Sequence, residues 1–184
     1  MEKIYQEGCS AANKLFSFVI IISILCLTLI FGCAEESSNE KSIEKGRSAK
    51  IAFIYQGEFG GMWCIDSVKL TIDGNKILDE SFEGSSFPPD GWQTTGLMLP
   101  PYTWFRGSTN AYITDIHDGD FCAQIWGAFE YQSERLILPE LESERLESAH
   151  EIALEFWIIG ATSLYDYAHI TVEIYLPKYN RWAK

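Results

Sequence analysis

The chain has 184 residues, a formal net charge of −12 and an aromatic content of 14%. This length accommodates one domain with a substantial core, and the acidic balance excludes a nucleic-acid partner. The many aromatic residues favour β structure or a face that binds sugar rings.

The N-terminal segment is dominated by an apolar run. This uncharged run extends from Leu15 to Phe31, follows Lys3 and Lys14, and ends at Gly32 and Cys33. It is short for a membrane span, which needs about twenty apolar residues. Positive residues before such a run are typical of a signal peptide.

The end of the run contains a short motif. Ile30, Gly32 and Cys33 resemble the lipobox of bacterial lipoproteins, although Phe31 is bulkier than the residue usual there. The resemblance implies cleavage before Cys33, lipid on that cysteine, and anchoring to a membrane outside the cytoplasm. Ala34 in the next position resembles the residue that follows the lipidated cysteine in lipoproteins sorted to the outer membrane. The alternative is a plain transmembrane anchor in which Cys33 is incidental.

Two cysteines lie in the remainder of the chain. Cys64 and Cys122 both stand in strand-like runs and would pair readily in an oxidising compartment. Two separate buried thiols are the interpretation that we favour at this point. The spacing of Cys and His contains no metal-binding motif.

Beyond a polar tether at 33–49, the pattern indicates many short strands. Alternating or continuous apolar runs predict strands, and Asp73-Gly74 predicts a hairpin turn. The predicted strands cover 51–55, 62–72 (as one or two strands), 76–82, 111–116, 121–129, 135–138, 152–159 and 169–176. Only 140–151 has a helical composition. Short strands separated by turns favour an all-β fold, either a β-sandwich or a jelly roll.

Several motifs in a fixed order resemble one family. Residues 80–84 (ESFEG) and 87–92 (FPPDGW) resemble the opening of choice-of-anchor J, or cleaved-adhesin, jelly-roll domains, which are related to MAM domains. Further similar pieces follow at 117–127, 136–139 (LILP), 153–157 (ALEFW) and 169–175. The resemblance implies a jelly-roll β-sandwich over 50–184.

The order of two further pieces departs from the family. The strands that close a family member resemble 50–57 (KIAFIYQG) and 63–68 (WCIDSV), which here precede the opening motif. Either the domain is circularly permuted, which we favour, or the end of one domain precedes a truncated second one. Permutation predicts that the strands at 50–55 and 64–72 share a sandwich with those at 152–159 and 169–176.

The family resemblance also implies a structural Ca²⁺ site. Its ligands would be Glu83 and Asp66, with Asp118 and Asp120 in the acidic turn that follows His117. Carboxylate oxygens suit Ca²⁺. Alternatively, these residues belong to solvated turns, where Asp is common because it bonds the local backbone.

An aromatic segment is the candidate binding site. Trp92, Tyr102 and Trp104 stand in a proline-broken region, and exposed rings would stack on sugars or contact proteins. The alternative is that the rings close one end of the sandwich. No catalytic residue is predicted, because the chain lacks a Gly-x-Ser-x-Gly elbow and any paired-carboxylate strand motif.

The sequence therefore predicts three segments: a signal peptide at 1–32, a tether at 33–49 and the domain at 50–184. The predicted function is a lipid-anchored, non-catalytic adhesion module of the cell envelope, on the outer membrane, that binds a carbohydrate or protein ligand. The alternatives are a structural accessory lipoprotein and a jelly-roll glycoside hydrolase.

Overall fold

The computed structural model describes residues 14–23, 48–58, 60–161, 168–177 and 180–183, which form an all-β sandwich of two antiparallel sheets. The first sheet has the order β1 (Lys14–Ser23), β10 (Glu151–Ala161), β3 (Met62–Ile72), β7 (Phe121–Trp126) and β6 (Phe105–Ser108), and β4 (Asn75–Glu80) also pairs with β3. The second has the order β12 (Arg181–Ala183), β11 (His169–Leu176), β2 (Ser48–Gly57), β8 (Gln132–Ile137) and β5 (Gln93–Thr95), with β9 (Leu141–Glu142) also on β2.

The first two strands of the predicted domain lie within these sheets. β2 pairs with β11 over seven positions, from His169 opposite Gln56 to Tyr175 opposite Lys50. β3 pairs with β10 along nearly its whole length. The expected placement of 50–55 and 64–72 beside 152–159 and 169–176 is therefore confirmed, whatever the evolutionary origin of this chain order.

Strand β3 changes its inward face at one residue. Ile65 points into the main core between the sheets, and Val68 and Leu70 do so after Ser67 adopts a positive φ of 49°. The register between β3 and β10 shifts at the same place. Such a bulge lets an extra residue enter the strand, and it leaves the Asp66 side chain on the face opposite to Ile65.

A long connection covers the outer face of the first sheet. We call residues 109–120 the cover loop. Its Ile113 side chain is fully buried in a second, smaller core with Met62, Cys64, Cys122 and Ile159. The sequence predicted a strand at 111–116, and this prediction is wrong, because the segment folds down onto the sheet instead of pairing at its edge.

The favoured interpretation of the two cysteines is also wrong. Cys64 on β3 and Cys122 on β7 form a disulfide, with their Cα atoms 6.1 Å apart. Both residues are buried beneath the cover loop. The bond joins neighbouring strands across 58 positions of sequence.

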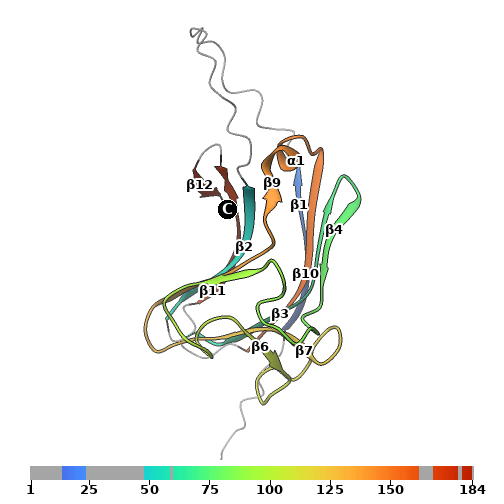
Figure 1. Cartoon of the computed structure of the whole chain (residues 1–184). Helices are drawn as coiled ribbons and strands as arrows, with labels where there is room; N and C mark the ends of the chain where they lie inside the picture. The colour runs from blue at the N-terminus through green and yellow to red at the C-terminus, as the bar shows by residue number, and fades with distance from the viewer. Residues whose placement is uncertain (1–13, 24–47, 59, 162–167, 178–179, 184) are drawn as a thin grey trace, which may run out of the picture.

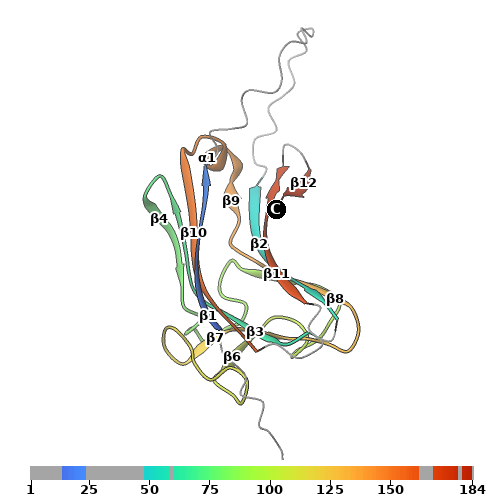
Figure 2. The same cartoon turned by 180° about the vertical axis from the view of Figure 1, so that it is seen from behind.

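The predicted helical segment contains a much shorter helix than 140–151. Helix α1 (Ser143–Glu147) has five residues and lies beside β9. Figure 1 shows α1 and β9 at one end of the sandwich and β6 and β7 at the other, and the reverse view in Figure 2 has the same arrangement. Within the described residues, no helix is long and apolar enough to span a membrane.

Part of the predicted signal peptide lies in the first sheet. The backbone of β1 pairs antiparallel with β10 through ten positions, from Lys14 opposite Gly160 to Ser23 opposite Glu151. Cleavage before Cys33 would remove β1, and it stays a prediction from the sequence. Cys33 itself, the lipobox and nearly all of the tether lie outside the described residues.

Candidate functional site: the cover loop and the distal tip

The carboxylate of Asp66 holds the cover loop against β3. Asp66 is 1% exposed, and its two oxygens accept hydrogen bonds from the backbone N–H groups of Ser67 at 2.7 Å and Asp118 at 2.8 Å. Burial raises the pKa of Asp66, and the two backbone hydrogen bonds and the nearby His117 oppose that rise. The alternative in which Asp66 belongs to a solvated turn is therefore wrong.

Glu83 binds the end of the same loop. Its Oε1 atom accepts hydrogen bonds from the N–H groups of Asp120 at 2.9 Å and Phe121 at 2.7 Å. Gly119 directly precedes these two residues and has a φ of +77°, and a Cβ added there would overlap the Glu83 carboxylate. The turn thus requires glycine for both its backbone conformation and the close approach of the acid.

The structure brings the two principal predicted metal ligands to one turn, but their oxygens face amide hydrogens. Asp118 and Asp120 contribute backbone N–H donors to these contacts, and their side chains are exposed. The Arg106 guanidinium donates to the carbonyl oxygens of Phe82 and Glu83 at 3.0 and 3.1 Å. A cation at these carbonyls would compete with a fixed positive charge.

No group of three or more His, Cys, Asp or Glu side chains within the described residues is arranged to hold a metal ion. The donor set here fits the amides of the turn better than it fits a hard cation, which needs six or more oxygen ligands. Calcium binding therefore stays a prediction from the family resemblance.

The three predicted ligand-binding aromatic residues occupy different environments. Trp92 is buried in the main core, with its ring centroid 5.5 Å from that of Phe82. Trp104 is 2% exposed and donates its indole N–H to the carbonyl oxygen of Glu134 at 3.2 Å. Tyr102 is exposed. Trp92 and Trp104 are therefore core residues, which corrects their prediction as exposed ligand-binding rings, and Tyr102 is the exposed one of the three.

Other large apolar side chains are exposed around Tyr102. We call residues 96–102 and 126–131 the distal tip. Leu97 is 97% exposed, Leu99 79%, Phe129 81% and Tyr131 62%. Trp126 lies at the border of the tip, with its ring centroid 6.2 Å from that of Phe105. Exposed apolar side chains gathered on adjoining loops indicate an interaction surface.

Backbone and side-chain hydrogen bonds join the two halves of the tip. The N–H of Trp126 donates to the carbonyl oxygen of Pro101 at 3.0 Å. The buried Gln132 amide donates to the carbonyl oxygens of Tyr102 at 2.9 Å and Trp126 at 3.1 Å, and it accepts from the N–H of Ala128. The tip is therefore one connected surface.

A second buried residue of β8 fixes the first half of the tip. Glu134 is buried, and its Oε1 atom accepts from the N–H groups of Leu97 at 3.0 Å and Met98 at 3.2 Å. A Cβ on Gly96 would overlap this carboxylate, so the loop needs glycine to pass over it. Sequence reasoning missed Gln132 and Glu134, although their alternation with the apolar Leu136 extends the strand pattern towards the N-terminus.

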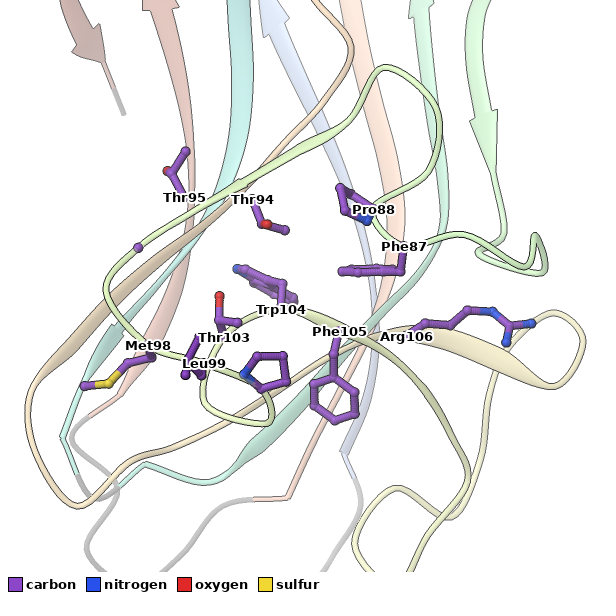
Figure 3. Close-up of a pocket in the computed structure, with 12 residues that line it drawn as sticks. Phe87, Pro88, Thr94, Thr95, Met98, Leu99, Thr103, Trp104, Phe105 and Arg106 are labelled. Atoms are coloured by element: carbon purple, nitrogen blue, oxygen red, sulfur yellow. The ribbon is translucent and has the colours of Figure 1, made fainter.

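A cavity opens beside the distal tip. Its volume is about 560 Å³, and its lining includes Phe87, the hydroxyl residues Thr94, Thr95 and Thr103, and the rings of Trp104 and Phe105. Figure 3 shows the Thr94 and Thr103 side chains close to the Trp104 ring, and Arg106 extending away from it. A cavity of this size with convergent polar groups and ring walls suits a small ligand.

The three histidines lie apart from this cavity. His117 stacks on Trp157 of β10, with ring centroids 3.7 Å apart. His150 lies just before β10, where its backbone N–H binds Asp73, and His169 is exposed on β11. None of them lines the cavity.

No protein-family model, curated protein or solved structure matches this chain.

Proposed function

We propose that this protein is a lipid-anchored, non-catalytic binding module that presents its distal tip to a ligand outside the cell. The observation that carries the proposal is the position of the tip relative to the tether. Ser48 begins β2, and Gly57 at the other end of β2 pairs with Gln132, which directly follows the tip. Ten residues of strand separate the two ends by about 30 Å.

A module anchored at Cys33 would direct that tip away from its own membrane. The exposed Leu97, Leu99 and Phe129 side chains would then meet a partner on another surface or in the medium. The Cys64–Cys122 disulfide supports an oxidising compartment, which agrees with export. The lipobox at Ile30, Gly32 and Cys33 supports lipid anchoring, and Ala34 supports the outer membrane.

Within this proposal the sandwich is a jelly roll of the choice-of-anchor J type with a circularly permuted chain. The pairing of β2 with β11 and of β3 with β10 supports permutation, because the family's closing strands join the same sheets as the later strands. The convergence of Asp66 and Glu83 on one turn also supports the family. A calcium ion held there would raise the melting temperature, and an unchanged melting temperature on chelation would contradict that part.

Attachment of whole cells tests the binding function. Cells that express the full chain are compared on immobilised glycans and extracellular proteins with cells that express the double variant Leu97→Ser/Leu99→Ser. We expect at least tenfold weaker attachment, because both side chains are exposed and would lose contact area. Tyr112→Ser, an exposed aromatic of the cover loop, is the matched control.

Equal attachment by the wild type and the tip variant would contradict the proposal and favour a structural accessory role in the envelope. Lipid anchoring has its own measurement, which is incorporation of labelled palmitate. Cys33→Ser is expected to abolish the label, and retention of the label would contradict anchoring through this residue.

A further inference from the structure

The cavity beside the distal tip has polar groups that the fold itself does not use. Thr94 and Thr103 line it with side chains close to the Trp104 ring, as Figure 3 shows, and neither hydroxyl group forms a hydrogen bond within the described part of the chain. A hydroxyl both donates and accepts, so the two of them can bind a partner that does the same. The cavity therefore offers hydrogen bonds to a ligand rich in hydroxyl groups.

Aromatic rings form the apolar part of the same cavity. The half-buried rings of Phe87 and Phe105 line it together with the small exposed part of Trp104, whose ring is fixed by its hydrogen bond to the carbonyl oxygen of Glu134. A fixed ring binds with little loss of conformational freedom. A ligand with one flat apolar face would pack on these rings while its polar edge reached the hydroxyl groups.

The electrostatics of the cavity exclude a charged ligand. Residues 93–105 contain no charged side chain, and Arg106 is the one charged residue in the lining. Its guanidinium is bonded to the carbonyl oxygens of Phe82 and Glu83 and lies 3.2 Å from the centre of the Phe121 ring. It is therefore turned away from the cavity, as Figure 3 also shows.

The net charge of the whole protein also disfavours an anionic ligand. This charge of −12 repels such a ligand at long range. Within the lining, no carboxylate is available to pair with a cation. A neutral ligand is the class that both the cavity and its surroundings accept.

We infer that this cavity binds an uncharged hexose unit of a glycan, with the apolar face of the sugar on the rings and its hydroxyl groups on Thr94 and Thr103. The volume of about 560 Å³ holds a ligand of one or two sugar rings. This inference rests on the proposed binding function and specifies its ligand. Sugars that carry a carboxylate or sulfate are excluded.

The experiment is binding of the purified full chain, in detergent micelles, to an array that carries neutral hexose oligosaccharides and their sialylated and sulfated counterparts. We expect binding to neutral glycans only. The double variant Thr94→Val/Thr103→Val keeps the shape of the cavity and loses two hydroxyl groups, so it should bind about tenfold more weakly. Thr109→Val is the matched control outside the cavity and should bind within about twofold of the wild type.

A further variant separates chemistry from folding. Thr103→Ser retains the hydroxyl and should bind within about threefold of the wild type, with an unchanged melting temperature. Acidic glycans that bind as tightly as neutral ones would overturn the inference, as would full binding by the double valine variant. If no glycan binds but attachment of cells still depends on Leu97 and Leu99, the saccharide assignment fails and the binding function stands. If attachment is also independent of those residues, both fail.

Discussion

The cover loop and the distal tip use their side chains in opposite ways. At the cover loop, the polar groups form hydrogen bonds within the fold. Asp66 and Glu83 accept hydrogen bonds from backbone amides, and Asn110 accepts from two N–H groups of its own loop. In the distal tip, the buried acid Glu134 fixes the backbone, and the Leu97 and Leu99 side chains are exposed. The acids around the cover loop thus stabilise the fold, and the exposed apolar side chains of the distal tip are the ones that we propose for binding.

The largest expected effect concerns the disulfide beneath the cover loop. The variant Cys64→Ala/Cys122→Ala should lower the free energy of unfolding by about 3 kcal/mol, because the bond closes a long segment of the unfolded chain. Urea denaturation measures the change. Binding by the tip should persist under conditions in which the variant is folded. Loss of binding by the folded variant would contradict the separation of stability from binding.

The next effect comes from Glu83. Glu83→Ala removes the acceptor of two backbone hydrogen bonds, and we expect a loss of about 2 kcal/mol in stability. The matched control is Glu130→Ala in the distal tip, because Glu130 is exposed and accepts no hydrogen bond within the described residues. A larger loss of stability in the control than in Glu83→Ala would reverse the roles of the two regions.

A smaller effect is expected from Glu134, and it should appear in binding. Glu134→Ala frees the N–H groups of Leu97 and Met98, so the loop that borders the cavity loses its fixed position. We expect about tenfold weaker binding to neutral glycans, because the loop must now become ordered when the glycan binds. Unchanged affinity in this variant would mean that the tip needs no such support.

The smallest effect is a pH dependence at Asp66. Burial raises its pKa, so the folded chain holds the proton more tightly than the unfolded chain does. The stabilisation from this proton is fully present when the pH is below the ordinary pKa of aspartate. It is lost as the pH rises through the raised pKa of Asp66 in the folded chain. Wild type should therefore gain stability relative to Asp66→Asn as the pH falls from 7 into that range. Urea titrations at several pH values measure the difference, and a constant difference would contradict the assignment.

The strands that sequence patterns predicted are those with a long, unbroken period. The alternation in 169–176 and the apolar runs in 51–55 and 152–159 correspond to β11, β2 and β10. β5 and β6 have only three and four residues, too few to display any period.

Two segments were ambiguous for physical reasons. Ile113 and Ile116 are spaced so that both reach the outer face of the sheet from a loop, and the sequence could not distinguish this from an edge strand. The apolar run at 15–31 suits a signal peptide, and the backbone of its first part also pairs with β10 within β1. Continuous apolar runs fit several buried environments equally well.

The candidate site could be predicted only in part. The family resemblance placed Asp66 and Glu83 at one turn, and the structure brings both there. Their amide partners could not be predicted, because these depend on how the cover loop folds back over β3. Leu97, Leu99 and Phe129 were overlooked, since an apolar residue in a loop has no pattern that distinguishes exposure from burial.

The central claim is that binding resides in the cavity beside the distal tip and stability in the cover loop. The most direct test is one titration, on the neutral-glycan array, of the full chain, of Thr94→Val/Thr103→Val and of Glu83→Ala at a temperature where all three are folded. The account predicts about tenfold weaker binding for the valine variant and wild-type affinity for Glu83→Ala. Wild-type affinity for the valine variant together with lost binding in Glu83→Ala would contradict it.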